Sequence, residues 1–441
     1  MAIKISVLIV GGGIGGLATA IALRRAGHHV TVLEGARELS EVGAGIQIPP
    51  NSSYILDTWG LLEKIKEKAV WPEHMNIRRY ANGKVISATR LNPDLEDKYG
   101  YPYFLIHRAD YIQLLCNAAT EIGAEVLVNA KVKYIDDAKT SVRLHNGTVF
   151  TADLIIGADG IRSKVRTAVI PEKVIEPRRS DNCAYRATVP AAAIQADSEI
   201  SHLLENHNSD FWIGHRCHIV AYPIKGGKLY NIVMSHPGEA SLTQWNESGN
   251  LYEMKEPYLK FDPIINKVLS KITQSQKWTL ADIPPLSRWV SCGGHITLIG
   301  DAAHAMLPHL AQGAAQAIED AATLGVLLSQ IHSVDSVPDF LNLYEQIRRP
   351  RVERIQKNSL ENGYTWHLPD GEEQIARDKA MREADELRKA NSSAKVESPL
   401  QWSDGDFQPW LYGHDAILVA KKALQEMTRN GQIGFQEKSK F

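Results

Sequence analysis

Three glycines near the N-terminus have the spacing that pyrophosphate binding requires. Gly11, Gly13 and Gly16 follow an apolar, β-branched run and open a stretch rich in Ala, Leu and Arg. Backbone N–H groups and a helix N-terminus can then meet phosphate oxygens without intervening side chains. Glu34 ends the next predicted strand, where its carboxylate can accept hydrogen bonds from a ribose and would repel a 2′-phosphate. These residues predict a dinucleotide site but do not distinguish NAD from FAD.

A second segment, DLIIGADGIRSKVR, combines an Asp-Gly pair with three basic residues. Asp159 and Gly160 follow a predicted buried strand, and Arg162, Lys164 and Arg166 come directly after them. Basic side chains in this position suit a phosphate-bearing ligand. For Lys164 and Arg166, an exposed charged helix turn explains the pattern equally well.

A third segment, LIGDAAHAMLPHLAQGAAQAIEDA, begins at Leu298 and joins a buried strand to an Ala-rich helix. Gly300 and Asp301 end the strand, and the helix is predicted from about Gly313 to Ser329. Taken alone, the Gly-Asp pair could be no more than a helix cap. The order and spacing of the three segments instead predict one site assembled from distant parts of the chain.

The elements that would carry these residues form an interrupted α/β domain. Strand, helix and strand are predicted at Ile3–Val10, Leu17–Ala26 and His29–Leu33, which is a βαβ unit with a parallel sheet. Short strands follow from about residue 125, and Asn146-Gly147 predicts a hairpin.

The middle of the chain has a different pattern. Alternating strands such as CHIVAYPI and KLYNIVMSH occupy about residues 179–286 and predict an antiparallel layer without a second glycine motif. Beyond residue 344 the chain is charged and helical, and one helix carries a predicted packing stripe of Ala376, Ala380, Ala384 and Leu387.

The predicted fold class is therefore α/β, with a Rossmann-like domain interrupted by a mostly antiparallel β-sheet domain and followed by C-terminal helices. The predicted boundaries are 1–72, 102–178 and 287–345 for the dinucleotide domain, 73–101 and 179–286 for the β-sheet domain, and 346–441 for the helical region.

Charge and cysteine content limit the possible partners. The chain has 49 Lys and Arg against 51 Asp and Glu, so no global field attracts nucleic acid or an anionic membrane. Four scattered cysteines without metal-ligand spacing indicate reduced thiols, and no apolar run is long enough to cross a bilayer. We expect a cytoplasmic monomer or homodimer that binds a small molecule, with no metal site.

The three segments and several shorter ones resemble class A flavoprotein monooxygenases, in particular the salicylate hydroxylase-like branch and its fungal secondary-metabolite relatives. The resemblance spans the chain in order, and its stretches are Val7–Asn51, His107–Asp110, Asp153–Arg166 and Leu298–Ala322, with weaker matches at Ala184–Pro190 and His218–Pro223. It implies the aromatic hydroxylase fold, FAD as cofactor, NADH or NADPH as transient reductant, and O2 as co-substrate.

The resemblance also implies roles around the flavin. Asp301 would meet the ribityl and pyrophosphate region, the amides of Gly313 and Ala314 would point at the isoalloxazine, and Asp159 would serve FAD and the passing nicotinamide nucleotide. Arg108 would reach the FAD, Val132 would contact the adenine, and Ala44 and Gly45 in EVGAGIQ (Glu41 to Gln47) would allow close backbone approach. Gln47 stands where some relatives have His, and a glutamine cannot carry a proton.

On the substrate side, the resemblance implies that the carbonyl of Pro308 shapes the oxygenation pocket, with His309 beside it. Arg186 matches an arginine near flavin and substrate. His218 and Tyr222 lie four apart on a predicted strand, hence on one face. Such groups can remove or delocalise a phenolic proton, although His218 could equally be a satisfied strand histidine. For Phe211, Trp212, His215 and Arg216 we favour a purely structural role.

The implied function is an FAD-dependent, NAD(P)H-consuming monooxygenase that hydroxylates a salicylate-like or phenolic ring through a flavin C4a-hydroperoxide. The alternative is epoxidation or dearomatising hydroxylation of a secondary-metabolite intermediate by the same flavin chemistry. An NAD dehydrogenase would leave GDAAH without a task, and a non-enzymatic binding module would use the fold without flavin. A halogenase is disfavoured because the chain has no WxWxIP string.

Overall fold

The computed structural model describes residues 2–39, 44–238, 246–391 and 395–429. Its first layer is a five-stranded parallel sheet of order β18-β11-β1-β2-β7. The strands are β1 (Ser6–Val10), β2 (His29–Leu33), β7 (Glu125–Leu127), β11 (Leu154–Gly157) and β18 (Ile296–Leu298). The predicted βαβ unit is confirmed, because α1 (Ile14–Arg25) joins β1 to its parallel neighbour β2.

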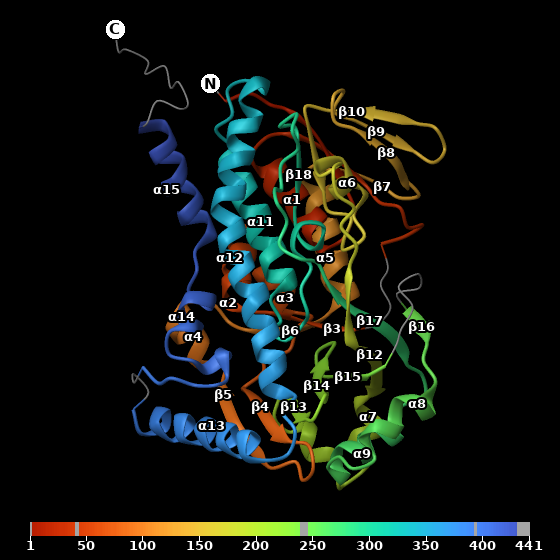
Figure 1. The fold of residues 1–441 in the computed structure, drawn as a ribbon, viewed down its shortest axis with the longest axis vertical. Coiled ribbons are helices and arrows are strands. Elements are labelled where there is room, and N and C mark those ends of the chain that lie inside the picture. Colours follow the sequence, from red (N-terminus) through yellow and green to blue (C-terminus); the bar gives the residue numbers. More distant parts are fainter. Residues whose placement is uncertain (1, 40–43, 239–245, 392–394, 430–441) are drawn as a thin grey trace.

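Helices bury the parallel sheet. Helix α1 packs against α5 (Arg108–Glu121) and α11 (Gly313–Leu328), and α11 in turn contacts α12 (Val337–Trp366) and α15 (Ala416–Arg429). Figure 1 shows α11 and α12 running along the sheet. Residues 296–328 form β18 and α11, and β18 pairs with β11 of the first sheet while α11 packs on α1. The chain therefore returns to its first layer after the central insertion.

The predicted hairpin is also confirmed. Strands β8 (Val132–Asp136), β9 (Ser141–Leu144) and β10 (Val149–Thr151) form a small antiparallel sheet. Gly147 in the turn has a φ of +91°, a backbone conformation that a glycine adopts without steric cost.

The second large layer is an eight-stranded sheet of order β16-β17-β12-β15-β14-β13-β4-β5. Its neighbours are antiparallel except β13 and β4, which are parallel. The strands are β4 (His74–Arg79), β5 (Val85–Arg90), β12 (Arg178–Pro190), β13 (Ser209–Gly214), β14 (Cys217–Ile224), β15 (Leu229–Pro237), β16 (Asn246–Ser248) and β17 (Gln276–Asp282). Since β4 and β5 join strands from 178–282, we propose to keep 73–101 with the second domain.

A two-stranded ribbon of β3 (Gly45–Ile48) and β6 (Phe104–His107) lies between the two layers, and β6 contacts β14. Apart from α13, which has 19 residues, the remaining helices are short. They are α2 (Pro50–Thr58), α3 (Leu62–Lys66), α4 (Asp94–Tyr99), α6 (Lys164–Val169), α7 (Ala191–Gln195), α8 (Leu251–Lys255), α9 (Pro263–Ser270), α10 (Asp301–His304), α13 (Glu372–Ala390) and α14 (Phe407–Tyr412), with 3₁₀ turns η1 (Ser201–Leu204), η2 (Glu256–Tyr258), η3 (Val334–Ser336) and η4 (Gln401–Ser403).

The predicted packing stripe of α13 is wrong. Leu387 is 57% exposed and Ala376 is also exposed. The helix instead packs a mostly polar face against β5. The residues of α13 that are buried on this face are Gln374, Arg377, Asp378, Met381, Ala384 and Asp385. Asp385 accepts hydrogen bonds from Ser87 Oγ and the Ala88 N–H, so the helix docks on the β5 backbone through polar contacts as well as apolar ones.

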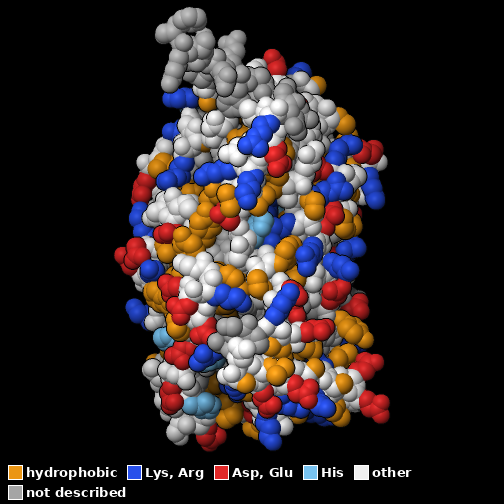
Figure 2. All heavy atoms as spheres, turned by 90° about the vertical axis from the view of Figure 1, so that its left-hand side faces the viewer, with side chains coloured by type: hydrophobic (Ala, Val, Ile, Leu, Met, Phe, Trp, Pro, Cys, Tyr) orange, Lys and Arg blue, Asp and Glu red, His pale blue; other side chains and the backbone are white. Residues whose placement is uncertain are grey.

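The surface carries mixed charge. Figure 2 shows basic and acidic side chains interleaved over one face of the molecule, as expected for nearly balanced charges. Among the described residues, no helix combines the length and hydropathy that a bilayer span needs.

Candidate active site

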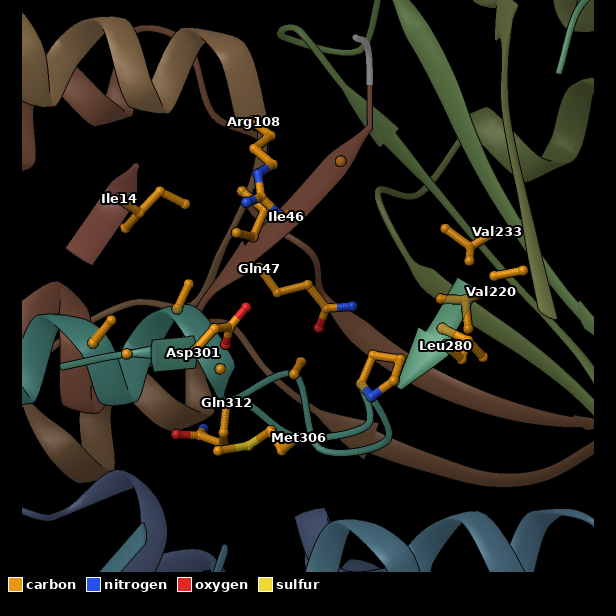
Figure 3. A pocket seen from close by; sticks show the side chains of 18 of the residues that line it. Ile14, Ile46, Gln47, Arg108, Val220, Val233, Leu280, Asp301, Met306 and Gln312 are labelled. Carbon is orange, nitrogen blue, oxygen red and sulfur yellow. The ribbon is translucent and has the colours of Figure 1, made fainter. Parts of the chain in front are cut away.

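A cavity of about 330 Å³ lies between the parallel sheet and the eight-stranded sheet. The segments after β1, β11 and β18 all reach it, because the carboxyl ends of parallel strands meet at one edge of a sheet. Figure 3 shows Asp301 and Arg108 pointing into this space from different sides, with Gln47 between them and Val220, Val233 and Leu280 on the far wall.

The glycine motif gives the cavity a backbone floor. Gly11 has a φ of +108°, and a Cβ there would lie 2.3 Å from the Ala158 carbonyl oxygen. A Cβ on Gly13, by contrast, would meet no atom within 4 Å, so the backbone there faces open space at the N-terminus of α1. Gly16 does not line the cavity, and a Cβ there would lie 2.0 Å from the Gly11 oxygen. Gly11 and Gly16 permit close packing, and Gly13 leaves room for a phosphate.

A second cleft of about 320 Å³ continues past Gly11 and Gly13 and includes Glu34, Val132 and Asp159. Glu34 accepts hydrogen bonds from the N–H groups of Gly12 (2.6 Å) and Ala36 (2.7 Å), which fix its carboxylate at the end of β2. The two cavities share Gly13 and Ala158 in their linings, so they adjoin each other.

Asp159 organises the turn after β11. Its carboxylate accepts hydrogen bonds from Ser163 Oγ and from the N–H groups of Lys164 (2.7 Å) and Val165 (3.2 Å) at the start of α6. It therefore shapes the wall of the second cleft through the backbone.

Both alternatives for Arg166, a phosphate contact and an exposed charged helix turn, are wrong. This side chain is only 3% exposed and donates to the carbonyls of Ala302, Ile161 and Ile175. Lys164 also bonds to a carbonyl, that of Val132 at 2.9 Å, but lines the second cleft together with Arg162. Arg166 thus ties the turn after β11 to α10, and it is not available to a nucleotide.

The opposite wall is built by residues 300–317. Asp301 and the first residues of α11, Gly313 and Ala314, line the cavity, and a Cβ on Gly313 would meet nothing within 4 Å. Arg108 is the first residue of α5, and its N–H donates to the Ala44 carbonyl at 2.9 Å. Ala44 itself is 2% exposed and does not line the cavity, whereas Gly45 does; Glu41–Gly43 fall outside the described residues.

A buried ionic network, which the sequence did not reveal, supports this wall. Asp320 accepts hydrogen bonds from the Gly300 N–H (3.0 Å), His304 Nε2 (2.7 Å) and Arg348 Nε (2.8 Å). Glu319 is paired with Arg348 and Arg351, and its side chain is fully buried. Burial alone would raise the pKa of both carboxyls, but the cationic partners lower it below its usual range. The network holds the Gly300-Asp301 turn against α11.

The four residues proposed as catalytic come together. Arg186 from β12, His218 and Tyr222 from β14, and Pro308 all line the main cavity. Phe211 lines it too, so the purely structural role expected for Phe211 is wrong. Sequence reasoning also missed Val220, Val233, Ser235, Leu280, Met306, Trp366 and Trp402, which complete the wall. Trp366 and Trp402 lie in chain regions with no recognisable motif.

Tyr222 packs directly on the ribbon between the layers. A Cβ at Gly45 would lie 2.4 Å from the Tyr222 ring, so only glycine fits there, and the Gly45 N–H donates to Asn231 Oδ1 at 2.8 Å. Burial raises the pKa of the Tyr222 hydroxyl above its usual range, although Arg186 opposes this shift. Tyr222 therefore remains a protonated hydrogen-bond donor. The Arg186 guanidinium lies 4.6 Å from the centroid of the Trp278 ring.

His218 is both a satisfied strand residue and a cavity residue. It is 3% exposed, and its Nδ1 lies 2.8 Å from His367 Nε2. Burial, with His367 and His309 nearby, lowers the pKa of His218 well below its ordinary value, so the ring is neutral.

Other candidates do not reach the cavity. His309 is 6% exposed and packs edge-on against His218, with ring centroids 5.6 Å apart. Trp212 faces the opposite side of its strand and donates to Asp262 Oδ2 at 3.1 Å. His215 and Arg216 are exposed in the turn between β13 and β14. The structural roles expected for Trp212, His215 and Arg216 agree with these positions. In the described part of the chain, no group of three or more His, Cys, Asp or Glu is arranged to hold a metal ion.

The fold and this two-sided cavity define a class of flavin-dependent aromatic hydroxylases. The FAD binding domain family matches residues 4–359, and the chain belongs to this family. It is 37% identical over 419 residues to the FAD-dependent monooxygenase OpS4 of Beauveria bassiana, covering 95% of this chain and 96% of that protein. It is 35% identical over 378 residues to a 3-hydroxybenzoate 6-hydroxylase of Klebsiella oxytoca, covering 85% and 92%.

A solved structure of a salicylate hydroxylase substrate complex has the same fold. Its TM-score is 0.75 at 26% identity, over 95% of this chain and 98% of that one. The protein is therefore an FAD-dependent monooxygenase with FAD as its cofactor, and both the family and the mixed α/β fold expected from the sequence are confirmed.

Proposed function

We propose that this enzyme hydroxylates a phenolic or salicylate-like ring with electrons from NADH or NADPH. The observation that carries the proposal is the composition of the main cavity. One side presents the Gly13 backbone and Asp301, and the other presents Arg186, His218 and Tyr222 within an apolar wall. Two relatives support it, since they are named as hydroxylases of salicylate and of 3-hydroxybenzoate. Both compounds are hydroxylated rings with a carboxylate.

The cofactor side fits FAD through its backbone shape and its donors. Gly13 and the α1 N-terminus suit the pyrophosphate, Glu34 the adenosine ribose, and Asp301 the ribityl chain. Further contacts are proposed from Gly11, Gly16, Ala44, Gly45, Arg108, Val132, Asp159, Gly313 and Ala314, of which Gly16 and Ala44 act through packing. When bound, FAD supplies two-electron transfer and the activation of O2.

The substrate side excludes water around the reacting ring. Phe211, Trp366 and Trp402 pack on one another, with ring centroids 5.2 to 5.4 Å apart, and all three line the cavity. Pro308 lies in the loop that joins this side to α11. A dry cavity strengthens each electrostatic interaction within it and limits unproductive peroxide release.

The polar groups in the cavity have complementary tasks on a phenol. Arg186 supplies positive charge that stabilises a phenolate. Tyr222 stays protonated and donates a hydrogen bond to the substrate oxygen, while the neutral His218 ring accepts one. Ionising the hydroxyl increases the electron density of the ring, which favours attack on an electrophilic oxygen.

A panel of ring substrates tests the proposal. Salicylate, 3-hydroxybenzoate, neutral phenols and larger polycyclic phenols are each mixed with the FAD-loaded enzyme and with NADH or NADPH. We expect at least one phenol to stimulate reductant oxidation and O2 uptake together and to gain one oxygen atom by mass. NMR of the product separates a hydroxylated arene from an epoxide or a dearomatised ring. Oxidation of the reductant that no phenol changes would contradict the proposal.

A further inference from the structure

A pair of histidines connects the buried cavity with the outside of the molecule. His218 lines the cavity, and its Nδ1 lies 2.8 Å from Nε2 of His367, which follows α12. The ring centroids are 5.0 Å apart and the planes differ by 24°, which fits rings lying edge to edge with an in-plane N–H···N bond. This bond leaves Nε2 as the ring nitrogen of His218 that can meet a ligand.

His367 differs from His218 in being partly exposed. The groups that face it come from several elements: His218 from β14, His309 from the loop before α11, His215 and Arg216 from the turn between β13 and β14, and Arg377 from α13. The Arg216 N–H donates to the His367 carbonyl at 3.3 Å, which fixes the residue against that turn. These neighbours are histidines and arginines, so they disfavour a lasting positive charge on His367.

The same surroundings make His218 unsuitable as the final acceptor of a proton. Burial and two neighbouring imidazoles lower its pKa well below the ordinary value, and burial with His309 and the nearby cations lowers the pKa of His367 to about 3. Neither ring would hold a substrate proton for long at neutral pH. His218 can therefore act as a base only if it passes the proton on to another group.

We propose that His367 is a proton-relay residue that carries the phenolic proton of the substrate from His218 to solvent. The inference rests on the proposed function, because it requires a substrate with an ionisable hydroxyl. The substrate O–H bond breaks as His218 Nε2 gains the proton, and the Nδ1–H proton of His218 passes to His367 Nε2. The Nδ1–H proton of His367 then leaves to water. The products are a bound phenolate and one proton in solution, and both rings end neutral.

A second polar path from the cavity does not offer this exit. Tyr103 donates to Gln47 Oε1, and Gln47 lines the cavity beside Tyr222. The amide of Gln47 does not ionise, and burial raises the pKa of Tyr103 well above its usual range. Beyond Tyr103 lies Tyr412, which is 2% exposed. Tyr412 in turn packs on the partly exposed Tyr99, and burial raises the pKa of both hydroxyls above their usual range, so among the described residues this path ends at no group that releases a proton near neutral pH.

The test uses 4-nitrophenol, whose phenolate is coloured, with the oxidised FAD-loaded enzyme. Stopped-flow absorbance follows the appearance of bound phenolate over a pH series and over a series of imidazole buffer concentrations. The variants are His367→Gln, which can keep the hydrogen bond to His218 but cannot relay a proton, and His367→Ala, which opens a path for free imidazole. His215→Gln is the matched control, since it removes an exposed histidine beside the relay.

We expect His367→Gln to keep the affinity for 4-nitrophenol but to slow ionisation by about a hundredfold, the lower end of the effect of a positioned proton acceptor. His367→Ala should recover speed as imidazole is added, and His215→Gln should match the wild type. Wild-type ionisation rates in His367→Gln, or a bound probe that stays protonated in the wild type, would overturn the relay. If the enzyme hydroxylates a phenol but His367→Gln leaves the rate of phenolate formation unchanged, only the relay is overturned. The substrate panel tests the proposed function separately.

Discussion

Burial raises the pKa of Tyr222 and lowers the pKa of His218, so both side chains stay uncharged within one cavity. One can therefore donate and the other accept a hydrogen bond at the same substrate oxygen. Arg186 adds the positive charge that neither supplies, and its place on β12 brings it to the wall that β14 forms with His218 and Tyr222. The division of tasks follows from the environment of each residue rather than from its type alone.

Tyr222→Phe tests the donor role. The change removes one hydroxyl and keeps the ring that packs on Gly45, so FAD occupancy and the yellow colour should remain. We expect substrate-dependent oxygenation to slow by about a hundred- to a thousandfold, since one preorganised donor at a developing oxyanion is lost. The measurement is product formation per NAD(P)H consumed, in the presence of the best substrate of the panel.

The control is Tyr252→Phe, at a tyrosine that is 77% exposed and lies outside the cavity. It should behave as the wild type. If Tyr222→Phe kept the wild-type rate and coupling, Tyr222 would have no role in oxygenation.

At the scale of elements, helix α11 links the cavity wall that we propose to hold FAD, formed by residues 300–317, to the rest of the molecule. Its N-terminal residues line the cavity, and its next turns carry Glu319 and Asp320 into the ionic network with α12. The Gly300 N–H donates to Asp320 across the loop between β18 and α11. The position of the Gly300-Asp301 turn thus depends on charges more than ten residues away in sequence.

Asp320→Asn should weaken both FAD binding and stability. The amide keeps the shape of the side chain but removes one of the two carboxylates that pair with Arg348. Because Glu319 remains, the loss should stay below the roughly 3–5 kcal/mol that a fully unpaired buried cation costs. Thermal unfolding with and without added FAD measures the effect, and flavin absorbance after gel filtration measures occupancy. Asp335→Asn in the exposed turn η3 is the control.

The loss of FAD distinguishes the proposed link from simple destabilisation. If Asp320→Asn melted earlier but retained full flavin at low temperature, the network would stabilise the fold without positioning the cofactor turn.

The elements differ in how far the sequence predicts them, for physical reasons. The hairpin at Asn146-Gly147 and the unit from β1 to β2 depend on local turn chemistry and on apolar periodicity, which are visible in a few residues. The buried face of α13 is largely polar, so the search for an apolar stripe chose the wrong side. Trp366 and Trp402 reach the cavity only through tertiary packing, and no motif marks either residue. Arg166 follows a recognisable motif, yet its burial could not be inferred from its charge.

For the whole molecule, buried histidines predict lower stability in acid. Burial lowers the pKa of His309 to about 4 and of His414 to about 4, while an unfolded histidine titrates at about 6.5. Between these values the unfolded chain binds protons that the folded chain does not, so stability falls as the pH drops through this window. The complete shift at His309 corresponds to about 3 kcal/mol.

We therefore expect the melting temperature to fall by several degrees from about pH 7 to about pH 5, and His309→Gln to show a smaller fall. Differential scanning calorimetry at matched ionic strength measures both. A melting temperature that is constant over this range would contradict the neutral state of the buried rings.

The C-terminal helical region closes the substrate side of a cavity whose other walls come from the two sheets. Trp402 in η4 is 1% exposed, lines the cavity, and donates from its indole N–H to the Leu310 carbonyl at 3.3 Å.

Trp402→Phe keeps an aromatic wall but removes this bond and part of the volume, so the variant should fold and bind FAD. Trp402→Ala opens the wall more widely, and the loss of so large a side chain costs about 3–5 kcal/mol of stability. Water then reaches the reacting ring, and we expect the fraction of NAD(P)H that ends as hydrogen peroxide to rise from the wild type through Trp402→Phe to Trp402→Ala. Peroxide yield and product yield from the same reaction measure this, with Trp71→Phe, at a tryptophan that does not line the cavity, as the control. Unchanged coupling in both Trp402 variants would mean that Trp402 has no part in keeping water out of the cavity.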